Sequence, residues 1–367
     1  MRFSPPYPLF FTFTDDGGLN WSVPAQVNQP PQRCAGGDAA VGPDGRIHAV
    51  WAGVASVSPF TEQLVGHAVS DNGGQSWSVT ESAFLLNGIQ GILPEKQNIR
   101  VNGLPRMAID RGGGERNGWI YVVTAEKDRL PAGSDPDIVF HRSSDGGQTW
   151  SAAVRVNQDA LNNGKIQYFP ALTVDHSGGI NIIYYDDRLT SSDSCGVFLS
   201  RSTDGGDSWQ DFRISDHHFQ PLPIGGLGQG YQGDNIDITS SGNTLWPVWM
   251  DNSSGIYQIW TAPVDINSLP IFTEQERVDL PTFKLNSVYP NPFNSSTTIE
   301  YELQKTAWIY LSLYNLVGQE LQVLVDQLQI PGIHRFSYSA SGLSSGIYIL
   351  KMTAEGFSHS HPLLLIK

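Results

Sequence analysis

Charged and aromatic side chains recur at the ends of apolar segments, and they are of the types that bind polar ligands. Arg106 and Arg188 could clamp a carboxylate through paired hydrogen bonds. Tyr231, Asp187 and Asp234 carry hydroxyl and carboxyl groups that can form hydrogen bonds to a polar ligand. The full set at equivalent places, which we expect to converge on one ligand site, is Asp38, Trp51, Arg106, Glu126, Asp186, Asp187, Arg188, Tyr231, Asp234 and Asp251. The alternative for any one of them is structural, because strand-capping and ion pairs such as Arg188 with Asp187 or Asp234 are common.

A nine-residue motif occurs four times and sets the expected architecture. Its copies are TDDGGLNWS at Thr14–Ser22, SDNGGQSWS at Ser70–Ser78, SSDGGQTWS at Ser143–Ser151 and STDGGDSWQ at Ser202–Gln210. Each copy follows a segment that alternates as a strand does, so each is expected to be a hairpin turn. The Asp or Asn side chain accepts hydrogen bonds from backbone N–H groups of the turn. The second glycine allows positive φ, and the tryptophan is expected to bury its ring between neighbouring units. The Asp or Asn of the four copies is Asp16, Asn72, Asp145 and Asp204. The second glycine is Gly18, Gly74, Gly147 and Gly206, and the tryptophan is Trp21, Trp77, Trp150 and Trp209.

A second strand–turn–strand pattern lies between the motifs. It covers Ala39–Trp51, Arg106–Thr124, Pro170–Tyr185 and Asp234–Trp249. Each unit therefore has four strands, and successive motif tryptophans lie 56, 73 and 59 residues apart, a period typical of a propeller blade. The second-to-third and fourth-to-first connections of all blades share one face. That geometry is what should bring the candidate ligand residues to one central mouth.

The repeated turns resemble the Asp-boxes, or bacterial neuraminidase repeats, of sialidase-like β-propellers, over about residues 1–265. The resemblance implies an all-β propeller with six blades. Four complete units run to Val264, and the N-terminus supplies only two outer strands of another. We therefore expect a ring that is N-terminally incomplete in this chain, with Met1 an internal start; a five-bladed ring completed in another way is the alternative.

The same resemblance makes an exo-α-sialidase-type glycoside hydrolase one functional hypothesis. The Arg-Ile-Pro signature of that family is absent, and LPRM at Leu104–Met107 is a poor substitute. The acid/base aspartate of the family comes from an early blade that this chain lacks. The catalytic residues are therefore left unassigned, with Arg106, Arg188, Tyr231, Asp187 and Asp234 as weak candidates.

The composition changes after Val264, where a linker is expected over residues 265–284 and a small immunoglobulin-like β-sandwich over residues 285–367. The sandwich resembles the C-terminal sorting domain of the type IX secretion system of Bacteroidetes-type bacteria. The likeness rests on YPNPFNSSTTIEYEL (Tyr289–Leu303), LYNLVGQEL (Leu313–Leu321), GLSSGIYILKM (Gly342–Met352) and the final Lys367. It implies that the type IX machinery handles these residues and that the protein is secreted or placed on the outer cell surface. Such export also needs an N-terminal signal, which we expect to be missing from this chain. An ordinary appended sandwich is the alternative.

Charge and composition exclude several classes of function. The net charge is −14, and the first 281 residues hold 17 basic and 31 acidic side chains, so this part should repel nucleic acid and anionic lipid. The sequence has no apolar run long enough to span a membrane. Cys34 and Cys195 are expected to be separate buried thiols, although they could pair in an oxidising compartment. No metal site or cofactor is predicted; acid pairs could bind Ca²⁺, but no calcium-loop motif indicates it.

These observations lead to three functional hypotheses. The first is a secreted or surface propeller that binds a glycan or a glycoprotein at its central mouth. The second is the exo-acting glycoside hydrolase, and the third is a passive surface scaffold or adhesin.

Overall fold

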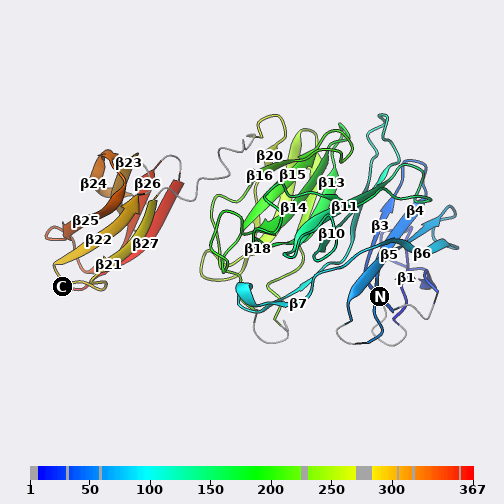
Figure 1. Cartoon of the computed structure of the whole chain (residues 1–367), viewed down its shortest axis with the longest axis horizontal. Coiled ribbons are helices and arrows are strands. Elements are labelled where there is room, and N and C mark those ends of the chain that lie inside the picture. The colour runs from blue at the N-terminus through cyan, green and yellow to red at the C-terminus, as the bar shows by residue number, and fades with distance from the viewer. Residues whose placement is uncertain are drawn as a thin grey trace. The chain divides into compact units, whose positions relative to one another are not determined.

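The computed structural model consists almost entirely of β-strands and divides into two compact units, residues 1–277 and 278–367 (Figure 1). It describes residues 7–29, 33–57, 60–224, 230–269, 283–303, 306–315, 319–354 and 357–367. Within these ranges the one helical element is the 3₁₀ turn η1 (Pro94–Lys96). The boundary between the units falls inside the segment expected to be a linker, most of which lies outside the described residues.

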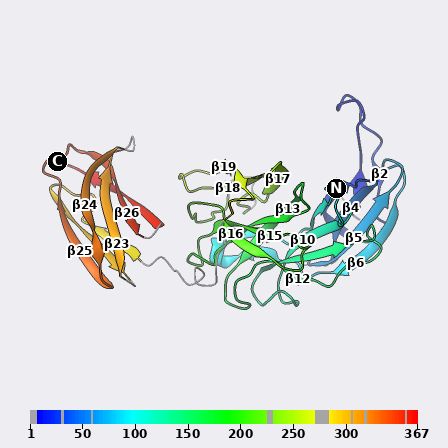
Figure 2. The same ribbon diagram turned by 90° about the horizontal axis from the view of Figure 1, so that it is seen from above.

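Three sheets of the first unit are four-stranded antiparallel meanders in chain order, which is the blade topology of a β-propeller. Figures 1 and 2 show these sheets following one another from the blue end of the chain to the green. The inner strands of successive sheets, β3, β9, β13 and β17, contact each other in that order. The blades are β3 (Arg33–Val41), β4 (Ile47–Val54), β5 (Glu62–Ser70) and β6 (Ser78–Leu85); β9 (Arg106–Ile109), β10 (Ile120–Glu126), β11 (Asp137–Ser143) and β12 (Val154–Arg155); and β13 (Gln167–Val174), β14 (Ile180–Asp186), β15 (Gly196–Ser202) and β16 (Gln210–Arg213).

The two ends of the propeller depart from this plan. At the N-terminal end β1 (Phe10–Phe11) and β2 (Ala25–Gln26) form a two-stranded sheet, the outer pair that the sequence predicts. In the described part of the chain the fourth sheet has three strand positions, because β19 (Gln258–Thr261) and β20 (Val264–Asp265) both pair with β18 (Thr244–Asp251), which follows β17 (Asp237–Ser241). The expectation of four complete four-stranded units is therefore wrong for the last one. The count of six blades stays a prediction.

The four motif turns share one hydrogen-bond pattern. In the third copy Ser143 Oγ donates to Asp145 Oδ1 (2.7 Å) and accepts the Gly147 amide (2.8 Å), while Asp145 Oδ1 also accepts the Thr149 amide (2.9 Å). Hydrogen bonds from Thr149 lower the pKa of Asp145 to about 2. The second glycines have φ of +92°, +85°, +88° and +97° at Gly18, Gly74, Gly147 and Gly206, as predicted. The motif acids therefore hold turns closed.

Neighbouring blades are joined by the motif tryptophans, each of which packs against a ring of the preceding blade. The ring pairs are Phe11–Trp77 at 5.1 Å, His67–Trp150 at 5.6 Å and Phe140–Trp209 at 5.2 Å between centroids. The same three rings cover the second glycine of each motif, so that a Cβ at Gly74, Gly147 or Gly206 would overlap them.

The first motif is the exception. Trp21 is 62% exposed, and nothing lies within 4 Å of a Cβ built on Gly18. The expectation that Trp21 is buried between units is thus wrong, because no described blade precedes its own.

Cys34 and Cys195 are separate buried thiols. Cys34 belongs to a small core between the first two sheets, and Cys195 to the large core of the later blades.

The second unit is a sandwich of seven strands, as predicted. One sheet has the order β21 (Phe283–Tyr289), β22 (Ser296–Leu303), β25 (Gly332–Ser339), and the other the order β24 (Glu320–Gln329), β23 (Ala307–Tyr314), β26 (Gly346–Ala354), β27 (Phe357–Leu365). Ile309, Leu311 and Leu313 are fully buried between the sheets, while Trp308 on the opposite face of the same strand is 57% exposed.

The packing of glycine under an aromatic ring can be tested with two matched alanine variants. Gly206 and Gly18 have nearly equal φ, so alanine strains the backbone by about 1–2 kcal/mol at either position. At Gly206 the new methyl group would also overlap the Phe140 ring, and this overpacking costs about 1–3 kcal/mol more; at Gly18 it would meet nothing. Urea unfolding should therefore show a clearly larger loss for Gly206→Ala than for Gly18→Ala, and equal losses would refute the contact.

Three buried histidines lie at the interface of the first two complete blades. His48 Nδ1 is 3.1 Å from His67 Nε2, and His141 stacks on Phe84 with centroids 3.9 Å apart. Burial lowers the pKa of His67 and of His141 to about 4 each, and also lowers the pKa of His48. As the pH falls, these histidines are protonated at a higher pH in the unfolded chain than in the folded protein. The stability that the neutral, buried histidines contribute is therefore complete above pH 6.5 and is lost as the pH falls toward 4.

His67→Phe should flatten this pH dependence. Phenylalanine already occupies the equivalent interface positions 11 and 140, so it should fit. The free energy of unfolding at pH 5, relative to pH 7, should fall by about 2 kcal/mol less in the variant than in the wild type. Urea titrations at both pH values measure this difference, and an unchanged pH dependence would contradict it.

Candidate binding site at the channel mouth

The connection between the first two complete blades is a hairpin that the sequence analysis missed. It consists of β7 (Gln90–Leu93), η1 and β8 (Ile99–Asn102), and we call residues 87–103 the strap. Its apolar side chains Ile89, Leu93, Ile99 and Val101 are buried in the large propeller core. The strap has no counterpart in the repeat, so the period gave no signal for it.

The tip of the strap carries Lys96 into the loop that follows β14. The Lys96 side chain is fully buried, and its Nζ pairs with the Asp187 carboxylate and donates to the Ser192 and Ser194 carbonyls. Asp187 Oδ1 also accepts the Ile166 amide at 2.7 Å. Asp187, expected at the mouth, is therefore occupied in a buried ion pair.

Arg188 and Asp186 belong to a second buried network. Arg188 Nη2 lies 2.6 Å from Asp186 and 3.7 Å from Asp159, and its Nη1 pairs with Asp211. Burial raises the pKa of Asp186 to about 6 even though Arg188 opposes the shift. Arg188 therefore forms structural ion pairs, but its partners are Asp186 and Asp211 and not Asp187 or Asp234, which the sequence analysis named.

Three further expected mouth residues are also enclosed. Glu126 Oε1 accepts the Thr124 hydroxyl (2.7 Å) and its Oε2 accepts the Asn87 amide (3.1 Å) at the root of the strap. Asp251 Oδ2 accepts Trp249 Nε1 at 2.8 Å and lies 3.1 Å from His217 Nε2. Trp51 is completely buried in the core beside β1.

A cavity of 180 Å³ does open where the inner strands begin, and it brings together Arg106 and Asp234. Each inner strand supplies part of its wall. The lining residues are Gly36, Gly37, Asn102, Leu104, Pro105, Arg106, Phe169, Pro170, Asp234 and Asn235.

The two remaining candidates lie beside this cavity. Asp38 lines an adjoining cavity that shares Gly36 and Gly37, and its carboxylate accepts the Met107 and Ala39 amides. Tyr231 lies under Arg100, 4.9 Å from guanidinium carbon to ring centroid.

Two of the inner strands are distorted at this level. The register of β3 against β4 shifts at Gly36–Gly37, and that of β13 against β14 shifts at Phe169–Pro170. Phe169 has φ of +52°, which is strained for a bulky side chain. A Cβ at Gly36 or Gly37 would overlap Leu104 or Leu9. Bulges and strained residues concentrate beside binding sites, where they redirect the backbone around a ligand.

Unlike the other charged groups on this face, Arg106 and Asp234 are available to form hydrogen bonds to a ligand. Arg106 is half-buried and makes no hydrogen bond or ion pair with any residue in the described ranges. Asp234 accepts one long hydrogen bond, from Asn102 Nδ2 at 3.4 Å. A free donor group and a free acceptor group thus face one polar cavity.

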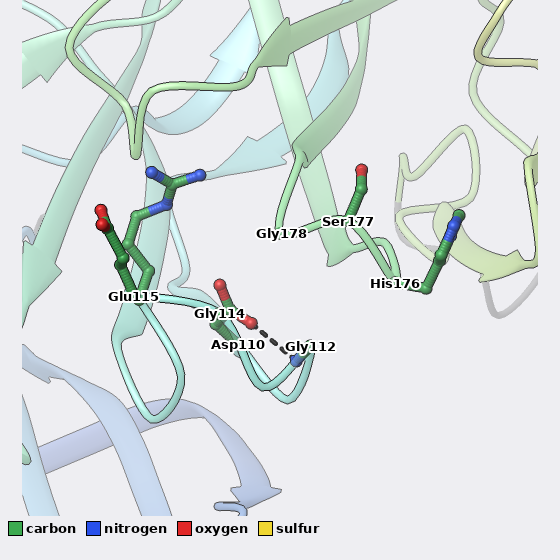
Figure 3. Close-up of a pocket in the computed structure, with 8 residues that line it drawn as sticks. Asp110, Gly112, Gly114, Glu115, His176, Ser177 and Gly178 are labelled. Atoms are coloured by element: carbon green, nitrogen blue, oxygen red, sulfur yellow. Dashed lines mark hydrogen bonds between the residues drawn. The ribbon is translucent and has the colours of Figure 1, made fainter.

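A larger cavity of 360 Å³ lies among the turns that join the first and second strands of the blades (Figure 3). Two of its polar side chains are engaged, since Asp110 accepts the Gly112 amide (2.8 Å) and Arg116 donates to the Thr203 carbonyl (2.9 Å). Figure 3 shows the His176 side chain pointing away from Asp110. The described residues contain no group of three or more acidic, histidine or cysteine side chains arranged to hold a metal ion.

The different roles of Arg188 and Arg106 predict different costs of removal. Arg188→Met leaves Asp186 and Asp211 buried without their cation, which should destabilise the propeller by about 3–5 kcal/mol. Arg106→Met removes a side chain that has no hydrogen bond or ion pair in the described ranges, and it should change stability by less than about 0.5 kcal/mol. Urea unfolding of the two variants measures the difference, and similar losses would show that Arg106 is structural as well.

Comparison with solved structures finds 69 chains with a similar fold. They include a sialidase from Trypanosoma rangeli in complex with sialic acid (10% identity, 97% of this chain and 57% of that one, TM-score 0.40). An α-L-arabinanase from Penicillium chrysogenum matches at 13% identity over 90% of this chain and 93% of its own (TM-score 0.39). PorZ, a surface component of the type IX secretion system of Porphyromonas gingivalis, matches at 14% identity and a TM-score of 0.32. The match covers 94% of this chain, which spans about half (47%) of PorZ.

These likenesses concern the arrangement of strands, and nothing about ligand or activity follows from them. No curated protein matches the chain. None of the helical turns in the described ranges is long and apolar enough to cross a membrane. Residues 287–366 match the family of secretion system C-terminal sorting domains, so the chain ends in a type IX sorting domain and is exported to the cell surface or secreted.

Proposed function

We propose that the exported propeller binds glycans at the cavity formed by the starts of its inner strands. The observation that carries this proposal is the unpaired Arg106 facing the same cavity as Asp234. Charged and amide groups fix the orientation of a polar ligand, and mainly backbone and apolar walls surround them, as is usual in small-molecule sites.

We do not extend the proposal to hydrolysis of the glycan. Arg188 and Asp187, two of the five weak catalytic candidates, are held in buried ion pairs. Tyr231 does not line the cavity that contains Arg106. The hydrolase hypothesis is tested by a panel of fluorogenic glycosides, on which the proposed binding protein should release no sugar.

A glycan array with the full chain tests the binding proposal. Arg106→Gln and Asp234→Asn each remove a charged hydrogen-bonding group from the cavity and should weaken the strongest signals tenfold or more, about 1.4 kcal/mol or above. Arg46→Gln is the matched control, because Arg46 is an exposed arginine that forms an ion pair with Asp44 in the turn between β3 and β4. Signals that fall equally in all three variants, or no signal for the wild type, would contradict the proposal and favour the passive scaffold.

A further inference from the structure

The size of the channel-mouth cavity limits what can enter it. Its 180 Å³ is well below the roughly 300–1,000 Å³ of pockets that enclose drug-sized ligands. The wall is formed by Gly36–Gly37 in β3, Pro105–Arg106 at the start of β9, Phe169–Pro170 in β13 and Asp234–Asn235 just before β17. A ligand that enters a cavity this small and partly open does so with one end first. The space suits a single ring at the end of a longer molecule.

The hydrogen-bonding groups select for hydroxyls. Arg106 can only donate and an ionised Asp234 can only accept, whereas the side chains of Asn102 and Asn235 can do both. A hydroxyl group also donates and accepts, so two adjacent hydroxyls can satisfy Arg106 and Asp234 together. A carboxylate accepts only, and it would leave Asp234 facing another acceptor.

The charge around the cavity disfavours an acidic ligand. Arg106 is the one cationic side chain in the lining, and Asp234 in the same lining opposes it. Asp38 lies close by, in the adjoining cavity; burial raises its pKa and the charge of Arg106 lowers it. A ligand carboxylate would therefore meet no surplus of positive charge, in a partly buried place where screening is weak.

We propose that the site binds the terminal sugar of a glycan, end-on, and that this sugar is neutral and presents two adjacent hydroxyls to Arg106 and Asp234. This inference rests on the proposed glycan binding and specifies its ligand class. It also separates the site from one that selects sugars carrying a carboxylate, which would need several unpaired arginines.

Titration calorimetry of the full chain with single-sugar methyl glycosides tests the inference. The probes are methyl galactoside, glucoside, mannoside, fucoside and arabinoside, the uronate counterparts of the first three, and methyl N-acetylneuraminate. At least one neutral glycoside should bind, and its uronate, or N-acetylneuraminate, should bind at least tenfold more weakly. Replacing the hydroxyl pair with its deoxy analogue should also weaken binding tenfold or more.

A charge variant supplies the second measurement. Asp234→Asn keeps the size of the side chain and removes its charge. It should therefore weaken binding of the neutral sugar and reduce the ratio of the affinity for the neutral sugar to that for an acidic one. Asp44→Asn, a change of the same kind on an exposed turn, should alter neither. An acidic sugar that binds as tightly as its neutral counterpart would overturn the inference.

The outcomes separate this inference from the proposed function. If glycans on the array bind in an Arg106-dependent way but no neutral monosaccharide does, the inference about a terminal neutral sugar fails and glycan binding stands. If neither the array nor any monosaccharide gives binding, both fail.

Discussion

The contact between neighbouring blades is the constraint on which the propeller depends. A ring from one blade is clamped between the tryptophan and the second glycine of the next motif, as Phe140 is by Trp209 and Gly206. Glycine is required twice over at this position, because φ is positive and because the ring leaves no room for a Cβ. The motif acid plays a different part, which is to fold the turn so that the glycine and the tryptophan are presented together.

The face of the propeller opposite these turns is organised by burial of charge. Lys96 reaches from the strap to Asp187, and Arg188 joins Asp186 to Asp211 across β14 and β16. Isolated charges would be costly at these depths, so each is paired, and the pairs tie the strap and loops to the blades. Arg106 and Asp234 differ from these paired groups, because they face a cavity and form no ion pair with any described residue.

The elements that could be predicted from the sequence are those encoded by local repetition. Each turn motif and its flanking strands lie within a short stretch, so their pattern indicated the blades, and alternation around Ile309 likewise indicated the sandwich. The starts of the inner strands were also predictable, since any blade places them at one mouth, and Arg106 and Asp234 do share a cavity.

What could not be predicted depends on residues distant in the chain. The enclosure of Asp187 requires Lys96, which is 91 residues away and in an insertion without a repeat partner. The period also assumes identical units, so it could not predict that Trp21 is exposed or that β19 and β20 share one partner strand in the fourth sheet. A signal for the cavity was available and unused: Gly36–Gly37 and Phe169–Pro170 interrupt strand patterns, as bulges near ligand sites do.

Hydrogen–deuterium exchange of the full chain, with and without a saturating mixture of neutral monosaccharides, tests the central claim most directly. Four stretches far apart in sequence line the cavity, at residues 36–37, 102–106, 169–170 and 234–235. The account predicts that ligand slows exchange in all four together and leaves residues 110–116 and 176–178, around the larger cavity, unchanged. Protection confined to the larger cavity, or to one stretch alone, would contradict it.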